Sequence, residues 1–235
     1  MKQLVFELAA PEPPAFANFV AGANREALAA LLRLARGDLA ETGVVIWGAA
    51  GAGKTHLLRA TVAEAAAAGR PARYLADPGA APAAVAGADA WTPGTVVAVD
   101  GVDGADAAAQ AALFTLYNAL AAAGGHLVAA GGRAPARLPV RDDLRTRLGY
   151  GLVYEIVPLP DADKPAALSA YARGRGFRLG DDVIAYLLAH GRRDMGSLVA
   201  TLAALDQHSL ALRRPITVPL LREWLQRPLE PDADA

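Results

Sequence analysis

A glycine-rich motif directly after a short apolar run is the feature that most limits what this chain can fold into. The segment GVVIWGAAGAGKTHLLRA contains G-x-x-x-x-G-K-T, with Gly48, Gly53, Lys54 and Thr55 at the defining positions. Glycines let backbone amides turn toward phosphate oxygens without a Cβ clash, and the positive end of a following helix adds to the attraction. The motif therefore predicts a buried strand, a phosphate-binding loop and a helix, in that order.

The same motif predicts the ligand, which is ADP or ATP with Mg²⁺. Lys54 is expected to neutralise the β- and γ-phosphates, and Thr55 is expected to ligate the metal. The alternative is a chance turn in a chain rich in glycine and alanine. Lysine occurs only three times in the 235 residues, so a chance match is on the order of one in a thousand.

A carboxylate at the end of a second apolar run completes the predicted metal site. In TVVAVDGVD, Asp100 follows the run and is expected to hold the Mg²⁺ shell through water. The alternative is an aspartate that caps a loop, as Asp103 or Asp106 could. The next residue, Gly101, offers no base to activate water, and Asp103 is expected to be wrongly aimed. We therefore expect the chain's own ATP hydrolysis to be weak or absent.

Apolar runs alternate with helix-compatible segments, which predicts an α/β fold with a parallel five-stranded sheet flanked by helices. The runs are residues 44–47, 74–76, 96–99, 127–130 and 153–157, after an amphipathic helix at 24–36. Beyond Pro158 the pattern becomes helical only, at 163–175, 181–190, 194–212 and 218–226. The expected parts are a tail at 1–8, a Pro-rich linker at 9–15, an α/β base domain at 16–158, a small helical lid domain at 159–228 and a disordered end at 229–235.

Composition excludes several classes of function. The chain has no cysteine, which rules out disulfides and thiolate catalysis and fits a reducing compartment. Its formal charge of −1 supplies no overall basic field for a nucleic-acid backbone. No run is long and apolar enough for a membrane span, and the N-terminus lacks a secretion signal. A soluble, cytoplasmic protein without strong direct DNA binding is expected.

Two longer stretches carry a resemblance to a known family. The run AFANFVAGANREAL, followed by GAAGAGKTHLLRA, resembles the AAA+ module of the bacterial replication initiator DnaA. Within that family the chain is more similar to Hda, the regulatory inactivator of DnaA, because it ends after the helical domain without a helix-turn-helix domain. The resemblance implies an AAA+ base with a lid, and it implies nucleotide contacts from Phe19, Val20, Gly48, Gly51, Ala52, Gly53, Lys54, Thr55, His56 and Arg193.

The resemblance also implies roles for two arginines. In DDLRTRLG, Arg147 resembles the arginine finger that reaches the nucleotide of a neighbouring AAA+ subunit. The alternative is a solvated arginine paired with Asp142 or Asp143, and Arg145 leaves the register open by one helical step. Arg193 resembles the sensor 2 arginine of the lid, with a surface cation as the alternative. At the sensor 1 position, residues 131–132 are two glycines, which removes a second group used in hydrolysis.

The N-terminal tail resembles the clamp-binding peptide of Hda proteins. Gln3, Leu4, Phe6 and Leu8 follow the pattern Gln-Leu-x-Leu-x-Leu, with phenylalanine replacing one leucine. Such an extended peptide can place Gln3 in a polar notch and the apolar side chains in a groove of the DNA polymerase III β sliding clamp. An N-terminal strand added to the sheet would show the same alternation.

The combined prediction is an adaptor that docks on the sliding clamp and uses Arg147 to stimulate hydrolysis of DnaA-bound ATP, which restrains replication initiation. Its expected partners are the clamp and DnaA, with a homodimer as an option and no membrane. A first alternative is an autonomous ATPase of the helicase-loader type that acts on single-stranded DNA. A second is a nucleotide-binding protein that positions DnaA-like partners without changing their ATP.

Overall fold

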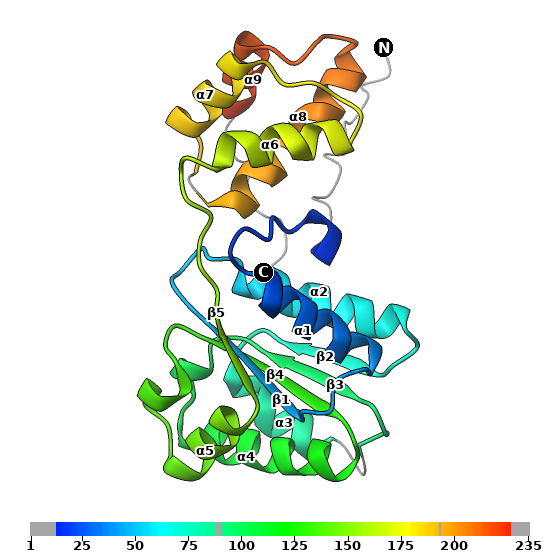
Figure 1. The fold of residues 1–235 in the computed structure, drawn as a ribbon, viewed down its shortest axis with the longest axis vertical. Coiled ribbons are helices and arrows are strands. Elements are labelled where there is room, and N and C mark those ends of the chain that lie inside the picture. The colour runs from blue at the N-terminus through cyan, green and yellow to red at the C-terminus, as the bar shows by residue number, and fades with distance from the viewer. Residues whose placement is uncertain (1–12, 88–90, 193, 227–235) are drawn as a thin grey trace, which may run out of the picture. The chain divides into compact units, whose positions relative to one another are not determined.

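The computed structural model describes residues 13–87, 91–192 and 194–226 of the chain. These residues belong to two compact units, Pro13–Leu159 and the part from Pro160 onward, which we describe separately (Figure 1).

The first unit is built on a parallel sheet of five strands in the order β2-β3-β4-β1-β5. The strands are β1 (Gly43–Trp47), β2 (Ala72–Leu75), β3 (Val96–Val99), β4 (His126–Gly131) and β5 (Leu152–Glu155). All four strand pairs are parallel, with β1 between β4 and β5. The expected α/β class and five-stranded sheet are confirmed, and the strand ends differ from the expected ones by up to two residues.

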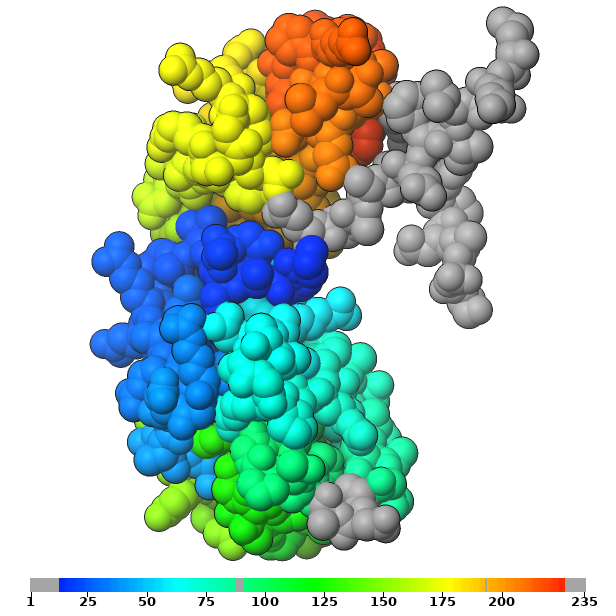
Figure 2. All heavy atoms as spheres, turned by 90° about the vertical axis from the view of Figure 1, so that its right-hand side faces the viewer, coloured from blue at the N-terminus to red at the C-terminus, as the bar shows by residue number. Residues whose placement is uncertain are grey.

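Helices cover both faces of this sheet, so its central strands are buried on both sides. The helices are α1 (Arg25–Arg36), α2 (Lys54–Ala67), α3 (Ala81–Ala86), α4 (Ala107–Ala122) and α5 (Asp142–Tyr150), with 3₁₀ turns η1 (Phe16–Asn18), η2 (Pro78–Ala80), η3 (Val102–Gly104) and η4 (Pro135–Arg137). Val44 and Ile46 of β1 pack with α1 and α2, which lie next to each other (Figure 2). Val45 packs on the other face with α3, α4 and α5.

The second unit is a helical domain with its own core. Its helices are α6 (Lys164–Gly174), α7 (Asp181–His190), α8 (Met195–Leu212) and α9 (Val218–Leu225). Leucines from all four helices are buried together, including Leu168, Leu187, Leu202 and Leu221. The apolar stripes of this region are therefore core residues, and the expected helical lid domain is confirmed. No helix in the described residues is long and apolar enough to cross a membrane.

His126 of β4 predicts a pH dependence of stability. The ring is buried, and its Nδ1 donates a hydrogen bond to the carbonyl oxygen of Glu41 at 3.0 Å. Burial lowers the pKa of His126, a nearby arginine charge lowers it further, and the hydrogen bond opposes the shift. The unfolded chain therefore binds more protons below about pH 6.5, so the free energy of unfolding falls as the pH drops through that value.

The check is urea unfolding at a series of pH values for the native chain and His126→Asn, whose amide can still donate to Glu41. The variant should lose less free energy of unfolding between about pH 7 and pH 5. The same loss in both proteins would show that His126 is not the titrating group.

Candidate nucleotide-binding site

The glycine-rich loop lies at the carboxyl edge of the sheet, between the end of β1 and the start of α2. The amide of Gly48 donates to the carbonyl oxygen of Gly131 at 3.2 Å, which ties the loop to the end of β4. A Cβ at Gly48 would overlap the carbonyl oxygen of Ile156, so only glycine allows this close approach. Open parallel sheets bind ligands at this edge, because the loops after neighbouring strands meet there.

The amides of the first turn of α2 point into this loop without a side-chain cap. Gly53 occupies the N-cap position in the left-handed conformation, with φ 99°, and no side chain of the described residues caps the helix. The helix therefore begins with amides and a partial positive charge that a phosphate can satisfy. Gly51 is exposed at the loop tip, whereas Ala52 is buried beneath it.

Lys54 is held over the loop by backbone oxygens. Its Nζ donates hydrogen bonds to the carbonyl oxygens of Gly48 and Ala49, both at 2.8 Å. These carbonyls keep the ammonium group next to the amides of the loop. A bound phosphate tail would replace these neutral carbonyl oxygens with charged oxygens as acceptors for Lys54. Hydrogen bonds between two charged groups are stronger than those to a neutral acceptor.

Thr55 and Asp100 meet as a candidate metal site. The Thr55 hydroxyl donates to Asp100 Oδ2 at 2.5 Å, although 45 positions separate the residues. Tyr74 of β2 also donates to this oxygen, at 3.2 Å, and the guanidinium group of Arg59 lies 5.0 Å from the Tyr74 ring. A hydroxyl and a carboxylate fit Mg²⁺, which takes a few protein oxygens together with water and phosphate. Within the described residues no cluster of three acidic or histidine groups forms a fuller protein cage.

The segment around η1 packs directly on the phosphate-binding loop. A Cβ at Gly53 would lie 2.6 Å from the ring of Phe19, and this ring lies 5.5 Å from that of His56. His56 Nε2 donates to the carbonyl oxygen of Ala15 at 2.9 Å, and burial lowers the pKa of its imidazole. Val20 is half-buried in the same segment. Ala15 and Phe19, which are distant from the motif in the chain, thus lie beside the loop together with His56.

Asp103 reaches the end of β4, which the sequence did not predict. Its Oδ1 accepts a hydrogen bond from the Gly132 amide at 2.9 Å, and a Cβ at Gly131 would lie 3.0 Å from the same oxygen. The carboxylate thus lies against the two glycines that lack a polar side chain. Gly101 provides no side chain, as expected, and donates its amide to Asp100 Oδ1 at 3.0 Å. In the sequence, only the two small residues Gly131 and Gly132 could have indicated that the Asp103 side chain has room to lie here.

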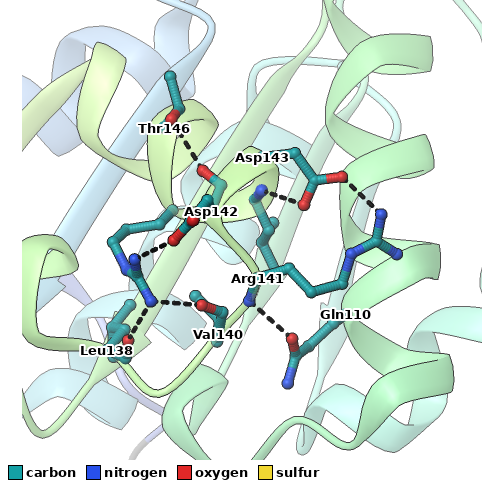
Figure 3. Close-up of polar contacts among 9 residues, drawn as sticks. Gln110, Leu138, Val140, Arg141, Asp142, Asp143 and Thr146 are labelled. Carbon is teal, nitrogen blue, oxygen red and sulfur yellow. Dashed lines mark hydrogen bonds and ion pairs between the residues drawn. The ribbon is translucent and has the colours of Figure 1, made fainter.

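The two arginines of α5 have different contacts. Arg145 is the ion-paired one: it binds Asp142 and donates to the carbonyl oxygens of Val140 at 2.5 Å and Leu138 at 3.3 Å. Figure 3 shows these acceptors beside Asp142. Arg147 is exposed and forms no ion pair with any other residue that the structure describes.

Arg147 instead lies beside two rings of α4. Its guanidinium carbon is 5.8 Å from the Phe114 ring centre and 6.0 Å from that of Tyr117. Burial raises the pKa of Tyr117, and the charge of Arg147 opposes that shift. The side chain therefore has a defined place but no anionic partner among the residues that the structure describes.

The start of α5 is hydrogen-bonded to α4. The Arg141 amide donates to Gln110 Oε1 at 2.9 Å, and the Arg141 guanidinium group pairs with Asp143 at 2.6 Å (Figure 3). Asp143 also accepts from the Leu144 amide at 2.8 Å. This network fixes the helix that carries Arg147.

Five expected site residues lie outside the described part of the chain. They are Gln3, Leu4, Phe6 and Leu8 of the tail and Arg193 of the lid.

Two family models match segments of the chain. A family model described as the bacterial DnaA ATPase domain matches residues 12–76, and a model described as the Hda lid domain matches residues 161–225. The chain is an Hda-like AAA+ protein of the DnaA family. Together the two matches support a DnaA-related role in replication control.

Solved structures share the fold. Domain III of the Thermotoga maritima replication initiation protein DnaA matches with a TM-score of 0.69 and 19% identity, over 93% of this chain and 100% of that one. AMPPCP-bound DnaA from Aquifex aeolicus gives 0.66 and 22%, over 84% and 66%. A Thermotoga maritima RuvB mutant gives 0.61 and 16%, over 91% and 72%. The AAA+ fold therefore extends over the Hda-like chain from the base into the lid.

Proposed function

We propose that the chain is an adaptor that binds the DNA polymerase III β sliding clamp and stimulates hydrolysis of DnaA-bound ATP, which restrains replication initiation. The Hda-type lid and the DnaA-type ATPase domain support DnaA as the partner. The observation that carries the proposal is the state of Arg147, which is exposed, lies on a pinned helix and has no ion pair among the described residues. The working place would be the replication machinery in the cytoplasm.

An arginine in this state suits charge stabilisation on a neighbour's phosphate. The planar guanidinium group matches phosphate oxygens, and arginine fingers supplied in trans raise kcat about 10³- to 10⁵-fold. The Arg147 side chain contacts the rings of Phe114 and Tyr117. Exchanging these contacts for a phosphate would cost about 1 kcal/mol or less, because exposed cation–π contacts are weak. Arg145 cannot move as freely, since two carbonyls and Asp142 hold it.

The chain's own ligand in this proposal is ADP or ATP with Mg²⁺. Lys54 and the first-turn amides of α2 would bind the phosphates, Thr55 and Asp100 would hold the metal, and Arg193 would contact the nucleotide from the lid. The bound metal supplies neutralisation of phosphate charge. Hydrolysis in cis would be weak, because Gly101, Gly131 and Gly132 supply no side chain to orient water.

The catalytic part is tested by measuring hydrolysis of DnaA-bound ATP in the presence of clamp and DNA. Arg147→Ala should lower the stimulated rate by about 1,000-fold or to the unstimulated rate, because the transferring phosphoryl group loses its cation. Thr146→Ala is the matched control on the same helix: its exposed hydroxyl only donates back to the Asp142 carbonyl oxygen. Equal stimulation by the native chain and Arg147→Ala would contradict the proposal.

The docking part is tested by clamp binding. The tail, residues 1–8, is proposed as the clamp peptide, and residues 9–15 as a spacer of up to about 20 Å. The triple variant Gln3→Ala, Leu4→Ala and Phe6→Ala should abolish binding of the purified chain to the sliding clamp, because the polar notch and the apolar groove lose their occupants. Lys2→Ala is the control, because Lys2 belongs to the tail but not to the Gln-Leu-x-Phe-x-Leu pattern. If the native chain itself does not bind the clamp, the tail is not a clamp peptide.

A helicase-loader type of ATPase is the second candidate, and Asp103 is the observation that favours it. The Asp103 carboxylate lies at the glycines of the β4 end, where it could orient water in place of the missing side chains. This candidate predicts ATP turnover by the chain alone, stimulated by single-stranded DNA and reduced by Asp103→Asn. Turnover that is absent without DnaA would remove it.

A further inference from the structure

One of the three tryptophans has no place in a hydrophobic core. Trp91 packs against the cluster of α3, α4 and α5, and Trp224 packs in the core of the helical unit. Trp47 is half-buried at the end of β1 but belongs to neither apolar cluster of its own unit within the described residues. A large aromatic side chain that the core does not use is available for a ligand.

Trp47 instead lines a pocket with two arginines. The pocket has a volume of about 610 Å³ and is lined by Trp47, Gly132, Arg133, Ala134 and Arg137. This volume lies within the usual range for small-ligand sites, about 300 to 1,000 Å³. Both arginines are exposed, and neither guanidinium group forms an ion pair or hydrogen bond with another residue of the described ranges.

The pocket lies on the opposite face of the sheet from α2, the helix that follows the phosphate-binding loop. Side chains alternate along β1, so Trp47 points to the same face as Val45, which packs with α4 and α5. The helix α2 packs on the opposite face, with Val44 and Ile46. The loop after β4 and the turn η4 supply the two cations of the pocket, and neither element belongs to the glycine-rich motif.

We propose that this pocket binds a nucleotide unit, with the base stacked on the indole of Trp47 and the phosphate held by Arg133 and Arg137. An indole beside two guanidinium groups that have no ion pair within the described part of the chain combines the two features that recognise a base and its phosphate without reading its sequence. A nucleotide of a single strand and a free mononucleotide share this chemistry. The net charge of −1 adds no long-range attraction, so the binding is local and modest.

The test is fluorescence anisotropy with a labelled oligothymidylate of about 12 nucleotides, a length within the site sizes of single-strand binders. Arg133→Ala and Arg137→Ala should each weaken binding about fivefold or more, and Trp47→Leu about tenfold, while Trp47→Phe should retain most of the affinity. With two phosphate contacts, the slope of log K against log salt should be about −1.4 in the native chain and about −0.7 in either arginine variant.

Arg36→Ala is the matched control, because it removes an arginine charge from α1, where Arg36 pairs with Glu64. It should leave the affinity unchanged. Both pocket arginines are exposed, so their variants should keep the native melting temperature even if Trp47→Leu loses stability. Equal affinity of the native chain, Arg133→Ala and Arg137→Ala would overturn the proposal, and so would an equal loss with Arg36→Ala.

Competition with thymidine monophosphate distinguishes the two sources of the nucleotide. If thymidine monophosphate displaces the labelled strand at a nucleotide concentration similar to that of unlabelled oligothymidylate, the pocket is assigned to free nucleotides. Displacement only by unlabelled oligothymidylate assigns it to a strand. Both results support the proposal as long as the affinity depends on Arg133 and Arg137. Because no part of this test uses DnaA or the clamp, its failure is distinguishable from failure of the adaptor function.

Discussion

Lys54→Ala should weaken binding of ADP and ATP about 100-fold or more, without unfolding the chain. Lys54 Nζ is held at the loop by the carbonyl oxygens of Gly48 and Ala49, next to amides that point to the same place. Removing the cation leaves the loop itself with only neutral amide donors for the phosphates, and loss of one partner from a desolvated charge pair costs about 2 to 5 kcal/mol. Truncation of this half-buried side chain removes no core contact.

The measurement is titration with a fluorescent ADP analogue in Mg²⁺, accompanied by thermal melts. The melting temperature without nucleotide should match that of the native chain. Added ADP should raise the melting temperature of the native chain only, because a ligand that binds the folded state stabilises it by mass action. Arg36→Ala, which removes a positive charge elsewhere in the unit, is the control and should bind normally. Unchanged affinity in Lys54→Ala would mean that the loop does not hold the phosphates.

Gly151→Ala should destabilise the first unit by about 3 kcal/mol, which corresponds to a fall in Tm of about 10 °C. Gly151 precedes β5, and its backbone lies beside that of Gly43 at the start of the parallel pair of β1 and β5. A Cβ at position 151 would overlap the carbonyl oxygen of Gly43 and lie 3.2 Å from its Cα. The carbonyl oxygen and the Cα of Gly43 are both backbone atoms at the start of a parallel strand pair. The clash with a Cβ can therefore be relieved only if the strands move apart.

Gly149→Ala is a matched control of opposite sign. Gly149 lies two positions earlier, exposed in the last turn of α5, and a Cβ there would meet only Pro135 at 3.9 Å. Alanine in a helix is favoured over glycine by up to about 1 kcal/mol, so this variant should melt at the native temperature or above it. Urea or thermal unfolding of both variants checks the pair. Equal melting temperatures would show that β5 can shift to accept a Cβ.

Local features of the sequence determined the fold class and the phosphate-binding loop. The motif from Gly48 to Thr55 is readable because consecutive backbone amides build the cradle, so all the required residues are adjacent in the chain. The alternation of buried strands with helices, and the switch to helices after Pro158, are also local patterns of hydrophobicity. The same reasoning placed Asp100 after β3, where the structure brings it to Thr55.

Tertiary structure decided which contacts each of several similar residues makes. The sequence left Arg145 and Arg147 as alternatives, and contacts with Asp142 and two carbonyls separated them. Asp103 reaches Gly132 across 29 positions, and Trp47 lines one pocket with Arg133 and Arg137 only because β1 and β4 are neighbours. Such contacts depend on strand order and on side-chain packing between distant segments. Neither is encoded in the spacing of residues along the chain, so the three-dimensional fold alone determines them.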